Sequence, residues 1–594
     1  MKLKTNFLKN CKNKILHCLI TLYLQISFVI MCIINISEKK TMHKKIKSII
    51  SVVLCLSVIA AVFSGCGSKD KEIDLIYPID GNMTSFDPQV AGTEDDFLIC
   101  ENVYEGLVRV DDEGEVTPGM AESWEVTNNG LTYTFHLKKG CKWHTNKTIE
   151  ERMGKNFKPE IVADDFVFAL QRAVDPNTNS PLYSTVSSIK NASAINAGKK
   201  SLSELGVTAV DNYTLVIELE NAVNGFLNVL STAVAAPCNR QFFNATKGRY
   251  GLELKYSMFN GQFIVSKVLD NSINLIQNET YTGPSPAKAK KLTFSITNDR
   301  EKIVENLASG VYDAAFLNGH ETKKISKKSK ITTVPYTDTM WGFVFNCSDN
   351  IVSNLNIRKS LCLSFGNADL EKTDFLTKAT GYIPPSCTMG NAPYRNSASD
   401  TFYKQDTSEA VELWKKGLKE LKVSTATLTV ITTEAMEEYV KEVFQDVQAS
   451  IGKTTGYGSG DNKKDVALTM KIEIVKENEL KTRIAKGDYQ IAFTEYKAHS
   501  SNPYSFIENI MNNSNYATAG SSEFADKISV LSYSVGKNGE SNFYSKCENE
   551  LLSTYSVCPV FFETSYYASA KNVSGIQFHA GSGRVNFCNA TRED

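Results

Sequence analysis

Strand-like and helix-like hydrophobic patterns alternate along most of this chain, and the alternation limits the folds open to it. Apolar residues recur at every second position in Leu131–Leu137 and Tyr213–Leu219, which predicts half-buried strands. Ala163–Ala173 and Glu434–Ile451 instead show helical spacing, and Leu468–Ile474 returns to the strand pattern. Interleaved strands and helices predict a mixed α/β body.

The length and charge of the chain narrow the prediction further. Domains usually contain about 100–200 residues, so a chain of 594 predicts several domains. Residues 1–65 hold ten Lys and one Glu, so residues 66–594 carry 55 Lys and Arg against 65 Asp and Glu. Nucleic acid binding needs a basic surface, and this acidic remainder argues against a nucleic acid partner.

Residues 42–65 have the layout of a secretory signal peptide. A basic stretch precedes the apolar run Ile49–Phe63, and small residues follow it. Cys66 then resembles the lipidated cysteine of a bacterial lipobox, and residues 66–72 have the composition of a flexible tether. A transmembrane anchor is the alternative, but the apolar run is shorter than the roughly 20 residues that a spanning helix needs. We therefore expect a lipid anchor on the extracytoplasmic face of the cell membrane.

A second apolar segment, Ile15–Ile36, lies within residues 1–41. One export signal is enough for secretion, so we interpret residues 1–41 as an over-extended start, with the initiator at Met42. An additional membrane helix is the alternative that the sequence leaves open.

The sequence indicates neither a cofactor nor catalysis. Nine cysteines follow Cys66 without any C-x-x-C pair, which favours small buried residues over a zinc or redox site. No Gly-x-Ser-x-Gly, His-Glu-x-x-His or Gly-Lys-Ser/Thr phosphate loop is present. We therefore predict no catalytic residue, no metal and no cofactor.

A set of short motifs is spread along the chain after the tether. They are Ser85–Pro88, Tyr104–Leu107, Ala121–Trp124, Leu131–Lys138, Lys142–Trp143, Ala163–Phe166, Val174–Thr178, Ser180–Pro181, Asn260–Gly261, Gly310–Asp313, Phe345–Asn346, Ile357–Arg358, Gly381–Pro385, Asn502–Pro503 and Val585–Phe587. Each motif is weak alone. Their joint order resembles that of the family 5 solute-binding proteins, the extracellular oligopeptide-binding proteins of ABC importers.

This resemblance implies the α/β periplasmic-binding-protein type II fold, with two lobes, a hinge, a cleft and an extra domain inserted in the first lobe. Lobe I would comprise residues 73–106, 238–336 and 557–594, the inserted domain residues 107–237, and lobe II residues 337–556. In such a fold the lobes close over an extended ligand and bury it.

The function implied is that of a lipid-anchored binding protein which captures oligopeptides or related small solutes and delivers them to ABC permease subunits. We expect a monomer that is not an enzyme. Two alternatives stay open, namely a ligand-sensing receptor with the same fold and a secreted hydrolase.

The resemblance also implies a change at the ligand's amino terminus. Family members hold the free α-amino group with the Asp of a Trp-x-Ala-Asp-Tyr-x-x-Pro motif, whereas here the stretch begins at Tyr496 and places His499 at the aspartate. A histidine does not supply the negative charge that an ammonium requires. Together with Lys497 it would suit a carboxylate or a phosphate. An ordinary surface histidine is the alternative.

Two acids are candidate substitutes for that aspartate, Asp338 and Glu94. Glu495 is excluded because strand alternation points it away from the face of Tyr496. Trp341 would either stack on a ligand or pack in lobe II. The remaining ligand-facing positions implied by the family pattern are Thr93, Leu182, Tyr183, Phe316, Leu317, Asn318 and Tyr336. Residues 150–158 depart from the pattern, and we expect a surface loop there.

Overall fold

The computed structural model describes most of the chain from Ile73 to Glu593. The ranges not described within it are 112–114, 224, 326–329, 366–372, 390–391, 397, 399–404, 452–466, 498–502, 504–505, 508–539 and 580–583. The chain divides into two compact units, and the described residues all belong to the second, Ile73–Asp594. The predicted extension 1–41, signal peptide, tether and Cys66 lie outside the described residues, and so does His499.

One sheet joins the start of the second unit to a segment far along the chain. Strand β1 (Asp74–Ile79) pairs in parallel with β10 (Lys291–Ile296). The sheet continues antiparallel through β9 (Ser272–Gln277) to β8 (Phe263–Leu269). Parallel neighbours require a long crossover connection, and here that connection contains a second sheet.

The second sheet confirms the two strands predicted from alternation. It has the order β4 (Ala121–Thr127), β5 (Thr132–Leu137), β7 (Thr214–Glu218) and β6 (Val207–Asp211). Tyr133, Phe135 and Leu137 are buried while the residues between them are half-exposed. Helix α5 (Ala163–Val174) matches the predicted helix.

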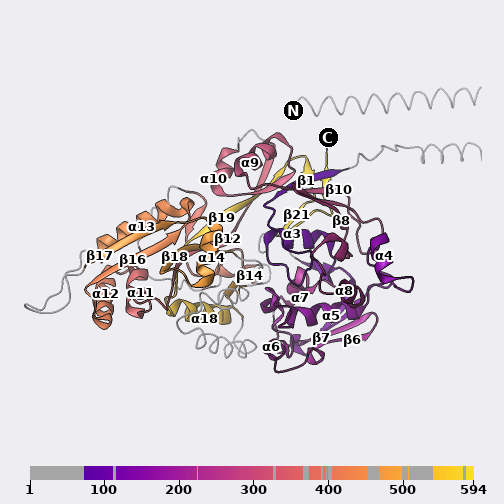
Figure 1. Cartoon of the computed structure of the whole chain (residues 1–594), viewed down its shortest axis with the longest axis horizontal. Coiled ribbons are helices and arrows are strands. Elements are labelled where there is room, and N and C mark those ends of the chain that lie inside the picture. The colour runs from indigo at the N-terminus through magenta and orange to yellow at the C-terminus, as the bar shows by residue number, and fades with distance from the viewer. Residues whose placement is uncertain are drawn as a thin grey trace, which may run out of the picture. The chain divides into compact units, whose positions relative to one another are not determined.

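A third sheet carries most of the later strands (Figure 1). Its order is β11 (Ala314–Leu317), β19 (Val557–Ala570), β12 (Ile331–Phe345), β18 (Ile491–Lys497), β16 (Thr425–Thr432) and β17 (Ala467–Ile474), with β13 (Leu376–Lys378) also pairing with β19. Strand β17 confirms the strand predicted at 468–474. Helix α13 (Glu437–Ser450) confirms the preceding helix, whose first turn is a 3-10 turn at Glu434–Met436.

The buried side chains form separate hydrophobic cores. One contains residues from Leu75 to Phe294 together with carboxyl-terminal residues up to Ala590, so it includes both the first two sheets. Two further cores lie on residues 340–562. The predicted lobe boundary at 336/337 falls inside β12, and this strand contributes Tyr336 to the first core and Met340 to another. Strands β12 and β19 therefore connect the cores.

The other helices and strands complete the described part of the chain. The helices are α3 (Glu94–Val103), α4 (Lys147–Met153), α6 (Ala192–Asn196), α7 (Phe226–Leu230), α8 (Arg240–Thr246), α9 (Arg300–Ser309), α10 (Gly319–Lys324), α11 (Leu355–Ser364), α12 (Thr407–Leu421), α14 (Glu477–Lys486) and α18 (Glu540–Ser553). The strands are β2 (Val108–Val110), β3 (Val116–Pro118), β14 (Thr388–Met389), β15 (Ala392–Pro393), β20 (Val573–Ser574), β21 (Gln577–His579), β22 (Arg584–Asn586) and β23 (Thr591–Arg592).

Helix α4 corrects the prediction of a surface loop at 150–158. The Asn146 side chain accepts a hydrogen bond from the Ile149 amide and begins the helix. Ile149 is buried and fixes the turn to the first core. The loop prediction was wrong for residues 150–153 because it weighed the departure from the family pattern above this local capping signal.

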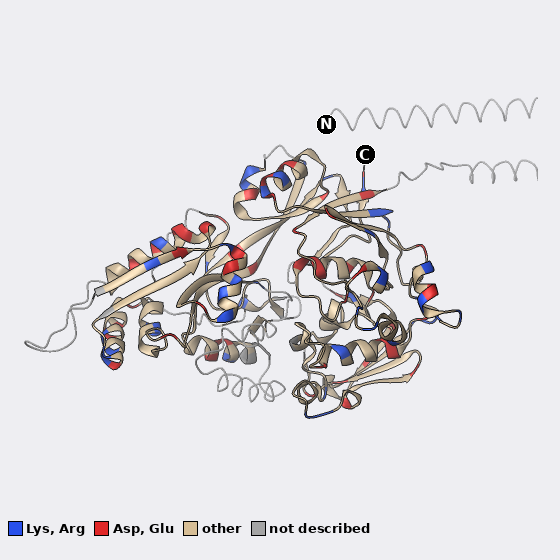
Figure 2. Ribbon diagram, in the orientation of Figure 1, with Lys and Arg blue, Asp and Glu red and all other residues tan. Residues whose placement is uncertain are grey.

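The nine cysteines after Cys66 are buried, as predicted. Acidic and basic residues are interspersed along the helices (Figure 2). Among the residues that the structure describes, no helix combines the length and apolar character needed to cross a membrane.

Candidate ligand-binding site

Two of the predicted ligand residues begin helices. Thr93 is the N-cap of α3: its hydroxyl accepts a hydrogen bond from the Asp96 amide at 3.1 Å, and the Asp96 carboxylate accepts one from the Thr93 amide. Asn318 caps α10 in the same reciprocal way with Glu321. Both side chains satisfy backbone amides that a helix start leaves open.

Several predicted residues are held in cores. Leu317 and Tyr496 are buried, and Tyr496 belongs to the same core as Met340, its partner across the strand pair. Trp341 is 8% exposed, its ring lies 5.8 Å from that of Phe493, and its indole N–H donates to Glu563 at 2.7 Å. These contacts favour packing over ligand stacking for Trp341.

The predicted aromatic residues Phe316 and Tyr336 form one group, and Leu182 and Tyr183 of the predicted insert form another. The Phe316 ring lies 5.7 Å from that of the buried Tyr336. Leu182 and Tyr183 pack at the edge of the first core, where the Tyr183 hydroxyl lies 3.3 Å from that of Ser193. Phe316 and Tyr336 therefore form an aromatic pair.

Several of the predicted residues form a charged group around Lys497. This lysine ends β18 and pairs with Thr339 of β12 in the strand register. Its ammonium nitrogen lies 3.8 Å from a Glu94 carboxylate oxygen and 4.0 Å from Oδ2 of Asp338. Four predicted residues therefore meet here, because Tyr336 also interacts electrostatically with Lys497.

A break in the strand register explains how Asp338 joins this group. Strict alternation would put Asp338 and Thr339 on opposite faces of β12. The pairing of β12 with β19 shifts register between Tyr336 and Thr339. Such bulges re-aim side chains. Asp338 consequently lies within reach of Lys497, which is opposite Thr339.

Two more carboxylates complete the surroundings. Glu495 lies two residues before Lys497 on β18 and is opposite Trp341, on the other face from Tyr496, as alternation predicts. Glu563 of β19 is opposite Thr339. We call Glu94, Asp338, Glu495 and Glu563 the carboxylate cluster.

The pKa values in this cluster show how burial and charge compete. Burial alone lowers the pKa of the Lys497 ammonium, but the nearby carboxylates of Glu94 and Asp338 outweigh it and raise that pKa. Burial raises the pKa of Asp338 and of Glu495, and Lys497 partly opposes both shifts. Burial raises the pKa of Glu563 to about 7, against the hydrogen bond from Trp341.

Glu563 was not predicted. It is the one charged residue of β19, and a lone charge in a largely apolar and aromatic strand is the signal that would have indicated it. Its partner Trp341 is far away in the sequence, so the contact between the two residues could be found only from the structure.

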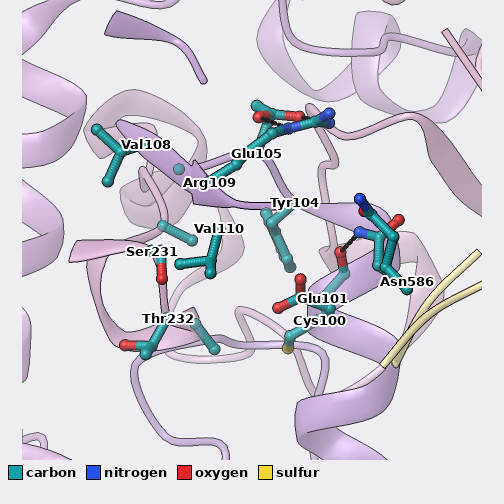
Figure 3. A pocket seen from close by; sticks show the side chains of 14 residues that line it. Cys100, Glu101, Tyr104, Glu105, Val108, Arg109, Val110, Ser231, Thr232 and Asn586 are labelled. Atoms are coloured by element: carbon teal, nitrogen blue, oxygen red, sulfur yellow. Dashed lines mark hydrogen bonds and ion pairs between the residues drawn. The ribbon is translucent and has the colours of Figure 1, made fainter. Parts of the chain in front are cut away.

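A pocket in the described part of the chain lies elsewhere (Figure 3). In it Glu105 is 2% exposed, pairs with Arg109 and accepts a hydrogen bond from the Tyr281 hydroxyl at 2.8 Å. None of the predicted ligand residues lines it. The lining residues are Cys100, Glu101, Tyr104, Glu105, Gly106, Val108, Arg109, Val110, Ser231, Thr232, Ala233, Ala236, Gln577 and Asn586.

Comparison with known proteins places the chain among binding proteins. A model of the bacterial extracellular solute-binding proteins, family 5 (middle part), matches residues 115–518, more than half of the chain. The oligopeptide-binding protein OppA of Bacillus subtilis is 26% identical over 568 residues, which cover 92% of this chain and 99% of OppA. The dipeptide-binding protein DppE of the same species is 24% identical over 530 residues, which cover 86% of this chain and 92% of DppE.

A solved structure agrees on the fold. The substrate-binding domain of an oligopeptide ABC transporter from Bacillus anthracis matches with a TM-score of 0.70 at 21% identity, covering 88% of this chain and all of that domain. The two-lobed type II binding-protein fold is thereby shown. The chain belongs to the family 5 bacterial extracellular solute-binding proteins, which bind solutes for transport and are not enzymes.

Proposed function

We propose that this chain is the binding component of an ABC importer for oligopeptides or related small solutes. It would capture its ligand in a cleft between the lobes and deliver it to permease subunits in the membrane. The observation that carries this proposal is the nearly full-length match to an oligopeptide-binding protein, which leaves little of either chain unmatched. A match confined to one domain would support the fold without the ligand class.

Cys66 and the signal sequence complete the proposal. The lipidated cysteine would hold a monomer at the outer face of the cell membrane, and residues 66–72 would act as its tether. Replacing Cys66 with Ala should release the protein into the medium and abolish its labelling by a radioactive fatty acid. Labelling that survives this substitution would contradict the anchor.

Ligand binding is tested by thermal unfolding in the presence of a mixed peptide pool, followed by mass spectrometry of the retained fraction. A binder gains melting temperature and returns its peptides intact. Cleaved peptides would instead support the hydrolase alternative. An unchanged melting temperature with every peptide and no co-purifying solute would contradict the proposal.

Transport is distinguished from sensing by following labelled peptide. In cells that lack this chain, uptake should fall while external peptide remains. A loss of a transcriptional response with unchanged uptake would instead favour a sensing receptor. Light scattering of the purified protein without its anchor checks the expected monomer.

A further inference from the structure

Among the described residues, carboxylates outnumber cations around Lys497. The carboxylate cluster contributes four acids from α3, β12, β18 and β19, and its electrostatic interactions converge on Lys497. Lys481 also interacts electrostatically with Glu495. An acidic site of this kind favours a cation, and Lys497 provides the central one.

Asp338 shows that the site has spare capacity for a donor. Its side chain is fully buried, and its Oδ1 accepts a hydrogen bond from the Thr339 hydroxyl at 2.9 Å. Within the described part of the chain, Oδ2 accepts none. The Lys497 ammonium lies 4.0 Å from Oδ2, longer than the roughly 2.7–2.9 Å of a charge-assisted hydrogen bond. A buried carboxylate oxygen is thus oriented toward a cation without a hydrogen bond to it.

Lys497 lies between the buried Asp338 and a carboxylate at the surface. Its side chain is 32% exposed, and that of Glu94 is 46% exposed, whereas Asp338 is fully buried. The ammonium therefore lies between a solvent-accessible carboxylate and an inaccessible one. A solute approaching Asp338 from the side of Glu94 would meet the lysine first.

We propose that Lys497 is a specificity-determining residue whose tethered ammonium occupies the place where the cluster would otherwise hold a cationic group of the ligand. This inference rests on the proposed function. Because the lysine is part of the chain, it competes at a high effective concentration with any free ammonium. It also repels a second positive charge, so the protein favours ligands that carry no ammonium at this position, such as peptides with a blocked amino terminus.

The test compares the full-length protein with Lys497→Met, which keeps the apolar stem and removes the charge. Calorimetry would use a mixed pentapeptide pool with free amino termini and the same pool acetylated. We expect wild type to bind the acetylated pool at least as well as the free pool. The ratio should shift about tenfold toward free amino termini in the Met variant, as one charged hydrogen bond permits.

Two control variants separate charge from folding. Lys497→Arg keeps a cation and should keep the wild-type ratio. Lys471→Met removes an exposed lysine on β17 of the same sheet and should also leave the ratio unchanged. An unchanged ratio in Lys497→Met overturns the inference, while peptide binding itself would still support the proposed function.

A second measurement needs no peptide. In Lys497→Ala the vacated site should accept ethylammonium, so ethylammonium chloride should raise the melting temperature more than potassium chloride at equal ionic strength. Wild type and Lys471→Met should show no such difference. If ethylammonium does not raise the melting temperature of Lys497→Ala in this way, the inference is overturned. This readout does not depend on peptide binding, so it is distinguishable from a failure of the proposed function.

Discussion

Glu548 and Asp338 are both fully buried carboxylates, yet their surroundings differ. Glu548 accepts hydrogen bonds from the amides of Tyr382 and Ile383 and from the Tyr394 hydroxyl, and it pairs with Arg395. Asp338 accepts one hydrogen bond, from its neighbour Thr339, and faces Lys497 at 4.0 Å. The same chemical group is saturated in one place and under-satisfied in the other.

The difference separates a structural acid from one available for recognition. Donors from several segments fix Glu548, and removing the acid would leave all of them unpaired. Asp338 has the Thr339 hydroxyl and one partly exposed lysine side chain. A buried charge with few donors is costly, and proteins retain such groups mainly where function requires them.

The largest expected effect is on the saturated acid. Glu548→Ala should lower the free energy of unfolding by about 3–5 kcal/mol, because it strands the buried Arg395 guanidinium and two backbone amides. Urea unfolding at neutral pH measures this. Lys546→Ala, an exposed position on α18, is the matched control and should change stability little. If Glu548→Ala lowered the free energy of unfolding by less than about 1 kcal/mol, Glu548 would not be a structural acid and would not differ from Asp338.

Glu563 provides a pH-dependent test within the cluster. Burial raises its pKa from 4.5 to about 7, so the folded protein keeps a proton that the unfolded chain releases. Its contribution to stability is therefore largest at low pH and declines as pH rises from about 4.5 to 7. Glu563→Gln should match wild type near pH 4 and exceed it by roughly 3 kcal/mol at pH 8.

The Trp341 indole N–H reports the same titration, since it donates to Glu563. Its proton resonance in wild type should shift with a midpoint of about 7. The Gln variant should show no such shift. A flat resonance in wild type would place the titration on another group.

His499→Asp sharpens the comparison by adding a carboxylate close in sequence to Lys497. We expect affinity for peptides with free amino termini to rise by roughly three- to tenfold, because an ammonium gains a charged partner. Acetylated peptides of the same sequence are the control. Equal calorimetric constants before and after the change would show that residue 499 does not face the amino terminus.

The smallest expected effect is at Asp338 itself. Asp338→Asn removes a poorly paired buried charge while Glu94 still faces the lysine, so stability should change by less than about 1 kcal/mol. Thermal unfolding beside Glu548→Ala makes the comparison direct. A destabilisation as large as that of the Glu548 variant would mean that Asp338 is also a structural acid.

Local patterns predicted much of the fold, because strand alternation and helical spacing are set by neighbouring residues. β5, β7, β17 and α5 were all located this way. The helix starts at Thr93 and Asn318 also carry local signals, with an acid three residues later. Those positions were instead given to the ligand, and the capping role was missed.

The candidate site was predicted only in part. Glu94, Asp338 and Lys497 were each singled out, but the bulge that brings Asp338 to Lys497 depends on how β12 pairs with β19. Glu563 reaches the site through that same pairing. Contacts between strands distant in sequence have no local pattern, so residue spacing alone did not indicate them.

Among the described residues, strand β19 contributes side chains to the first core and to both cores on residues 340–562, through Tyr567, Phe562 and Phe561. Its partners in the first core begin as early in the sequence as Leu75. During folding, residues from the start of the second unit must therefore wait for β19 before that core is complete.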